Sequence, residues 1–134
     1  MRGLLGLGLV GVLAADHALA SDIPVEVGKL EGQQVTLHVY PFLKEDELKT
    51  LRLVATNSQA LQVFITGDKA HFSALALAPA DGFIKDGQPA ETASAIGDLP
   101  DAAAAAKAAI AACDAKRNGK GKDCVVVLEV GPAK

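Results

Sequence analysis

Residues 113–130 read CDAKRNGKGKDCVVVLEV and contain the only two cysteines of the chain, Cys113 and Cys124. The segment that leads into them, 100–117, is mostly alanine, and alanine is the strongest helix former. The segment that ends the stretch, 123–130, is a short apolar run rich in β-branched residues, which favours a central strand over a helix. The stretch therefore predicts a helix, a turn and a strand that folds back beside the helix.

The first twenty residues have the layout of a secretory signal peptide. A short basic start, Met1 and Arg2, is followed by an uncharged apolar run at 3–15 and a small-x-small cleavage site at 18–20. That run is too short to cross a bilayer comfortably, and no second run of membrane length follows it. We therefore expect a periplasmic or secreted protein with residues 1–20 as the signal peptide, and no stable membrane insertion after its removal.

The two cysteines are expected to form a disulfide, because an even number of cysteines in an exported chain usually pairs. Cys113 ends the predicted helix and Cys124 begins the predicted strand, so the returning strand can bring the two within bridging distance. A closed loop of this size contributes about 3 kcal/mol of stability. Redox and zinc sites are the less favoured alternatives, since the spacing is not Cys-x-x-Cys and nothing in the sequence places His38 or His71 near the cysteines. We predict no metal and no cofactor.

The remaining chain alternates between strand-like and helix-like patterns. Val35, Leu37 and Val39 alternate with polar residues, as in a half-buried strand, and three acidic residues crowd the start of the next segment, as in a helix. Two further strand-like runs around a short turn predict a hairpin, and two Asp-Gly pairs then predict a loop. The predicted strands are 34–40, 61–66, 71–79, a short one around 93–96 and 123–130; the predicted helices are 44–57 and 100–117; the predicted loop is 80–91.

These elements, in the order β-α-β-β-(β)-α-β, predict an α+β domain over 34–134 with one mainly antiparallel sheet and two helices packed on one face. Residues 21–33 are predicted to be a lead-in segment with a short edge strand at 25–27. Asp98 is the predicted N-cap of the second helix, with Pro100 just inside its start, and Asn118-Gly119 is the predicted C-cap.

Four cations lie between the two cysteines: Lys116, Arg117, Lys120 and Lys122. They could form a basic finger that binds an anion, or they could simply keep an exposed turn soluble. The glycines of this loop follow a helix and precede a strand, whereas a phosphate loop follows a strand and opens a helix. The formal net charge of the whole chain is −3, which argues against a nucleic-acid partner because phosphate binding needs a cationic surface.

Two histidines, His38 and His71, are candidates for acid–base chemistry. Each falls on a predicted strand or at its edge, where a histidine is usually a surface or half-buried residue. A catalytic role requires a carboxylate or a nucleophile beside the imidazole, and the sequence does not identify one. The chain also has no Gly-x-Ser-x-Gly context for a serine nucleophile.

Three segments carry a resemblance: YPFLKEDELKTLRLVATNSQALQVFI at 40–65, FSALALAPADGFIKDGQPAE at 72–91, and the alanine helix with its Cys-loop-Cys and apolar strand. Together, over about 39–133, they resemble a group of short exported alphaproteobacterial proteins that have no defined catalytic motif. Chains of this kind are sometimes labelled 5-aminolevulinate synthase. A pyridoxal-phosphate enzyme needs a Schiff-base lysine, a phosphate cup and an acidic partner for the ring nitrogen, and the sequence does not support that label.

Our leading expectation is therefore an exported, non-catalytic accessory or binding protein of the periplasm, acting on an unknown envelope partner or small ligand. One alternative is a small periplasmic enzyme that uses His38 or His71 with a carboxylate. The other is an anion binder that uses the loop 116–122.

Overall fold

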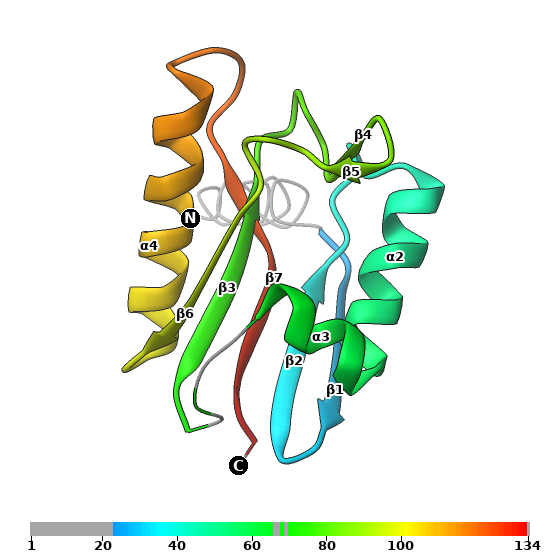
Figure 1. The fold of residues 1–134 in the computed structure, drawn as a ribbon, viewed down its shortest axis with the longest axis vertical. Helices are drawn as coiled ribbons and strands as arrows, with labels where there is room; N and C mark the ends of the chain where they lie inside the picture. Colours follow the sequence, from blue (N-terminus) through cyan, green and yellow to red (C-terminus); the bar gives the residue numbers. More distant parts are fainter. Residues whose placement is uncertain (1–22, 66–67, 69, 134) are drawn as a thin grey trace, which may run out of the picture.

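A computed structural model describes residues 23–65, 68 and 70–133 of the chain, so the predicted signal peptide, 1–20, lies outside the described residues. Five strands form one sheet in the order β1-β2-β7-β3-β6, and all four neighbouring pairs are antiparallel (Figure 1). The predicted α+β class with one mainly antiparallel sheet is confirmed. In chain order the elements are β1 (Val25–Leu30), β2 (Gln33–His38), α2 (Glu45–Thr56), α3 (Ser58–Phe64), β3 (Phe72–Leu77), β4 (Ile84–Lys85), β5 (Gln88–Pro89), β6 (Ser94–Leu99), α4 (Ala102–Arg117) and β7 (Val125–Pro132).

The apolar run at the end of the chain is the central strand, as predicted. β7 lies between β2 and β3, and Leu128 is opposite Leu37 on one side and Leu75 on the other. All three leucines are almost completely buried. A central strand is covered by neighbours on both edges and by side chains on both faces, which is why its sequence is mostly apolar, with Glu129 as the one charged residue of β7.

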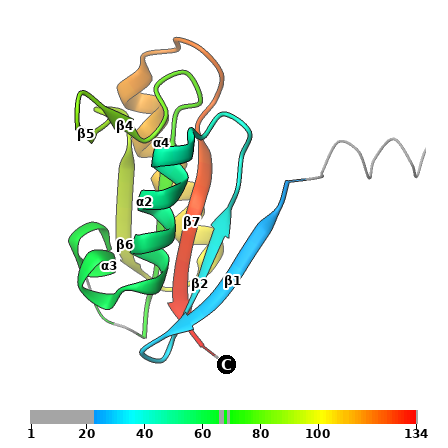
Figure 2. The same cartoon turned by 90° about the vertical axis from the view of Figure 1, so that its right-hand side faces the viewer.

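Helices cover both faces of the sheet, which corrects the prediction that the helices pack on one face. Leu75 and Leu77 of β3 pack into the core formed with α2 and α3, whereas Ala74 and Ala76 pack into the core formed with α4. Because successive side chains of a strand point to opposite faces, α4 lies across the sheet from α2 and α3. Figure 2 shows this arrangement, with α2 and α3 in front of the sheet and α4 behind it.

The alanine-rich composition of α4 allows it to lie close to the sheet. Ala105 and Ala109 are fully buried, and they face the fully buried Ala74 and Ala76 of β3. Because the side chains on both partners are small, the helix can approach the strand closely, and this core is thin. The opposite core contains the larger side chains, including Leu51 and other aliphatic residues of α2 and α3.

The segment predicted as a strand at 61–66 is helical up to Phe64, so the predicted hairpin with 71–79 is wrong. The side chain of Asn57 accepts a hydrogen bond from the N–H of Ala60 and caps α3, which follows directly on α2. Leu61 is buried against the rest of the core. Short apolar runs are ambiguous between strand and helix, and here the cap decides in favour of the helix.

Three boundaries are refined by the structure. The edge strand predicted at 25–27 extends to Leu30, and the short strand predicted near 93–96 extends to Leu99. Because that strand runs on through Asp98, the predicted N-cap is wrong, and Asp101 caps α4 by accepting a hydrogen bond from the N–H of Ala104 at 2.8 Å. Within the described part of the chain, no helix has the length and apolar character needed to span a membrane.

Candidate functional site

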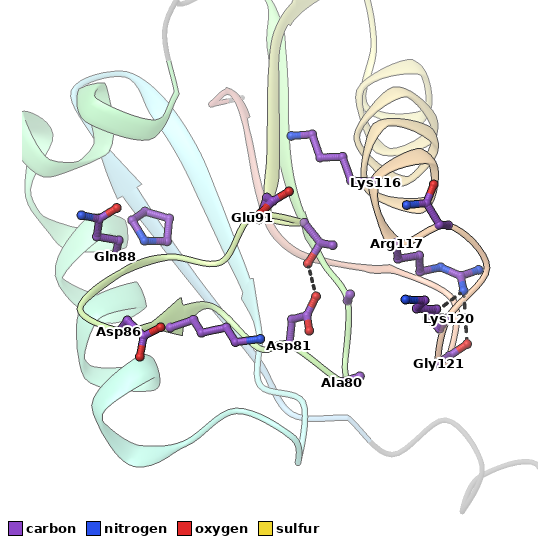
Figure 3. A pocket seen from close by; sticks show the side chains of 14 residues that line it. Ala80, Asp81, Asp86, Gln88, Glu91, Lys116, Arg117, Lys120 and Gly121 are labelled. Carbon is purple, nitrogen blue, oxygen red and sulfur yellow. Dashed lines mark hydrogen bonds between the residues drawn. The ribbon is translucent and has the colours of Figure 1, made fainter.

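A cleft of about 840 Å³ opens at one end of the sheet. One wall is the arm, which we define as residues 80–92 and which includes the small β4–β5 hairpin. The other wall is the Cys loop, which we define as residues 113–124 and which includes the last turn of α4 (Figure 3). The cleft is lined by Ala78, Ala80, Asp81, Lys85, Asp86, Gln88, Pro89, Glu91, Thr92, Lys116, Arg117, Asn118, Lys120 and Gly121.

The tip of the arm is a two-residue hairpin turn. Asp86 and Gly87 have φ angles of 55° and 79°, both in the left-handed region, and they connect Lys85 to its strand partner Gln88. An Asp-Gly pair suits such a turn because both residues adopt positive φ more easily than other residues do. The second Asp-Gly pair of the predicted loop therefore has a definite structure.

The base of the arm is held by the carboxylate of Glu47, which is 2 % exposed. Its Oε2 accepts hydrogen bonds from the backbone N–H groups of Phe83 at 2.7 Å and Ile84 at 2.9 Å. Its Oε1 accepts a third from the N–H of Lys44 at 2.9 Å, at the start of α2. Burial alone would raise the pKa of Glu47, but these three N–H donors outweigh it and hold the pKa below the usual value. Glu47 is therefore a buried anion that fixes the arm to α2.

Gly82 makes this anchor possible. Its φ is +71°, and a Cβ at this position would lie 2.7 Å from Oε2 of Glu47. Any side chain would clash with the carboxylate in addition to straining the backbone. The neighbouring Phe83 is 1 % exposed, and its ring packs 5.5 Å from that of Phe64 in α3, measured between ring centroids. The arm is thus attached to both helices on its side of the sheet.

The Cys loop is closed by the Cys113–Cys124 disulfide, as predicted, with Cα atoms 6.1 Å apart. Both cysteines are buried in the core under α4, at 0 % and 4 % exposure. Asn118 ends α4 in the left-handed conformation, which confirms the predicted C-cap and turns the chain toward β7. The disulfide therefore fixes the end of α4 to the start of the central strand.

Arg117 organises the interior of the Cys loop. Its Nε donates to Asp114 at 2.7 Å and its second terminal nitrogen to Asp123 at 2.6 Å. The other terminal nitrogen donates to the carbonyls of Lys120 and Gly121 at 3.2 and 3.1 Å. The hydrogen bond from Arg117 lowers the pKa of Asp114 and correspondingly raises that of Arg117. Arg117 is thus occupied within the loop.

The four candidate cations of the Cys loop divide into three kinds of residue. Lys116 and Lys120 line the cleft, and in the described part of the chain neither ammonium forms an ion pair. Arg117 also lines the cleft, but all three of its nitrogens donate hydrogen bonds within its own loop. Lys122 is not among the lining residues. The basic finger expected from the sequence is therefore reduced to two lysines facing the arm.

Both candidate histidines have a carboxylate partner, which the sequence could not identify. Nε2 of His38, at the end of β2, lies 2.6 Å from Oε2 of Glu129 on β7, and both side chains are partly exposed. Nδ1 of His71 lies 2.6 Å from Oδ1 of Asp98, and this pair is more exposed. The hydrogen bond with Asp98 raises the pKa of His71.

These two pairs lie on separate parts of the sheet. Glu129 borders a second hollow of about 390 Å³, together with Gln34, Thr36 and Phe72. Among the residues that the structure describes, neither imidazole hydrogen-bonds to a serine, threonine or cysteine side chain. The same residues contain no group of three or more histidines, cysteines and carboxylates placed to hold a metal ion.

No protein-family model, curated protein or solved structure matches this chain.

Proposed function

We propose that the protein is an exported binding protein of the cell envelope, and that its ligand occupies the cleft between the arm and the Cys loop. The observation that carries the proposal is that each wall has its own buried anchor. Glu47 holds the arm through three hydrogen bonds, and the Cys113–Cys124 disulfide holds the loop. A cleft of about 840 Å³ falls within the size range of small-molecule sites.

Rigid walls favour binding because the protein loses less conformational entropy when the ligand binds. Here the anchors are placed outside the cleft lining, so the lining side chains remain available to a ligand. Lys116 and Lys120 are the clearest examples, since within the described residues the only side-chain hydrogen bond of either is a 3.5 Å contact from Lys116 to the carbonyl of Ala93. Leaving these groups unused by the fold is what a recognition surface requires.

Export to the periplasm or beyond is supported by two features. The N-terminal residues 1–20 have the charge and hydropathy layout of a signal peptide. The buried disulfide requires an oxidising compartment to form and persist. Native mass spectrometry of the protein isolated from the periplasm without reductant tests this part directly. The expected mass is that of residues 21–134 less two hydrogens.

Binding is tested with the small-molecule fraction of an envelope extract. The wild-type protein is incubated with the extract, separated from unbound material and measured by native mass spectrometry. We expect a discrete added mass on the wild type, loss of that mass in a Lys116→Ala, Lys120→Ala double variant, and retention in a Lys122→Ala control. An absence of added mass on the wild type, or its retention by the double variant, would contradict the proposal.

A second candidate function is acid–base catalysis at the pair of His38 and Glu129. The observation in its favour is their 2.6 Å contact at the border of the second hollow, which is the arrangement of a histidine base with its orienting carboxylate. An activated ester such as p-nitrophenyl acetate serves as a general probe. Turnover that His38→Gln abolishes and His71→Gln preserves would favour this candidate, whereas equal rates in all three proteins would exclude it for such esters.

A further inference from the structure

The two walls of the cleft carry opposite charge. Among the lining residues, the arm contributes three carboxylates and one lysine, a net charge of −2 at neutral pH. The Cys loop contributes two lysines and one arginine, a net charge of +3, and no carboxylate. Figure 3 shows the labelled acidic side chains on the arm side and the labelled basic side chains on the helix side.

Resting on the proposed binding function, we propose that the ligand is zwitterionic: a short peptide or amino-acid-like compound with a free carboxylate and a free ammonium. Its carboxylate faces Lys116 and Lys120, and its ammonium faces Asp86 and Glu91. The cleft thus selects a ligand by two poles of opposite sign rather than by one.

The positive wall offers two ammonium groups for the ligand carboxylate. Arg117 is less available for this role, because four hydrogen bonds to Asp114, Asp123 and two loop carbonyls already engage all three of its nitrogens. Lys120 forms no side-chain hydrogen bond or ion pair within the described residues, and Lys116 forms only the long contact to Ala93. A lysine ammonium is a compact charge with three donors on a flexible stem, so it can adapt to a carboxylate from several directions.

The negative wall offers carboxylates for the ligand ammonium. Asp86 and Glu91 are exposed, and in the described part of the chain their side chains form no ion pair or hydrogen bond. Asp81, deeper in the arm, accepts a hydrogen bond from the hydroxyl of Thr92 at 2.7 Å and closes the base of the arm. The two exposed carboxylates of the arm are therefore the ones that the fold leaves unused.

Opposite charges so placed would be expected to pair with each other if the walls could approach. In the described residues, however, no ion pair joins the arm to the Cys loop. Glu47 and the disulfide hold the walls at a fixed separation. A simple anion placed between them would be attracted by one wall and repelled by the other, and a simple cation would meet the reverse. A zwitterion is complementary to both walls at once.

Trialanine provides a probe whose two poles can be removed separately. Isothermal titration calorimetry at low ionic strength, on the exported protein, compares the free peptide with its N-acetylated, C-amidated and doubly blocked forms. We expect the free peptide to bind most tightly and each single block to weaken binding about five- to tenfold. Added salt should reduce the advantage of the free peptide, because screening weakens the attraction at both poles.

Variants of each wall assign the poles. In the double variant Lys116→Gln, Lys120→Gln, amidation of the peptide should no longer weaken binding, while acetylation should still weaken it. In the double variant Asp86→Asn, Glu91→Gln, acetylation should no longer weaken binding, while amidation should still weaken it. The control variant Lys122→Gln should respond to both changes as the wild type does. Equal binding of the free and the doubly blocked peptide would overturn the zwitterionic ligand while leaving the cleft as a binding site. If no form of the peptide binds at millimolar concentration, the zwitterionic ligand is overturned as well. The envelope-extract experiment then decides separately whether the cleft is a binding site.

Discussion

Replacing Glu47 by alanine removes the one carboxylate that attaches the arm to α2, and we expect this change to lower the free energy of unfolding by roughly 4 kcal/mol. The side chain is almost completely buried and accepts three backbone hydrogen bonds of 2.7 to 2.9 Å. Hydrogen bonds to a charged acceptor contribute about 1.5 kcal/mol or more each, and two of the donors belong to the arm. The expected loss is a large fraction of the stability of a small domain, which is about 5–15 kcal/mol.

The control for this substitution lies two residues earlier. Glu45 also occupies the first turn of α2, but its side chain is exposed and accepts no hydrogen bond within the described residues. Glu45→Ala should therefore cost only the interaction with the helix dipole, a few tenths of a kcal/mol. Glu47→Gln should fall between the two, since its amide group replaces one of the oxygens that accept backbone N–H groups.

Urea denaturation followed by circular dichroism measures the three free energies of unfolding, and amide hydrogen exchange identifies the segment that loosens. We expect the amides of Phe83 and Ile84 to lose protection in Glu47→Ala before those of the central strand do. A Glu47→Ala variant whose free energy of unfolding lies within 1 kcal/mol of that of Glu45→Ala would refute the reasoning. So would unchanged protection of the two arm amides.

Three further predictions follow from the same anchors. Gly82→Ala should cost at least 1 kcal/mol more than Gly87→Ala in urea denaturation, because both need a positive φ but only a Cβ at 82 meets a carboxylate, at 2.7 Å. Replacing Cys113 and Cys124 together by alanine should lower the free energy of unfolding by about 3 kcal/mol, and a loss below 1 kcal/mol would show that the disulfide does not constrain the chain. Because folding lowers the pKa of Glu47, the unfolded chain binds more protons in acid, so the contribution of Glu47 to the free energy of unfolding is present above about pH 4.5 and is lost as the pH falls below it. Glu47→Gln should flatten this pH dependence in urea midpoints measured between pH 3 and 7. An equally steep loss of stability in the variant would contradict the role of the ionised carboxylate.

The parts of the fold that could be predicted from the sequence are those in which local pattern and tertiary position agree. The alanine helix, its C-cap at Asn118, the disulfide and the central strand all belong to this class. The segment after Asn57 does not, because a short, largely apolar run fits either a strand or a buried helix. Its outcome depends on a cap and on burial of Leu61, which no local pattern reveals.

The sequence analysis also did not predict helices on both faces of the sheet, although the sequence of β3 contains a signal for this arrangement. Its residues alternate between alanine and leucine from Ala74 to Leu77. Both the alanines and the leucines are buried. The alternation therefore marks the face with the thin core and the face with the thick core, and neither face is exposed to solvent. Helical cover on each face of the strand is what such a pattern requires.

The candidate site was predictable only in part. The sequence points to the cations of the Cys loop, but not to the opposite wall, because the arm approaches them only through the tertiary fold. The sequence indicates for Glu47 only a place in the first turn of a helix, because its contact with Phe83 spans 36 residues. The carboxylate partners of the histidines are equally distant, with His38 and Glu129 separated by 91 residues.

A two-dimensional NMR titration of the ¹⁵N-labelled protein with free trialanine is the most direct test of whether the cleft binds a ligand. We expect saturable shifts of amides on both walls together, within 80–92 and 116–121, with little change around His38 and Glu129. Shifts centred on the second hollow, or on one wall alone, would contradict the claim that the cleft between the arm and the Cys loop is the binding site.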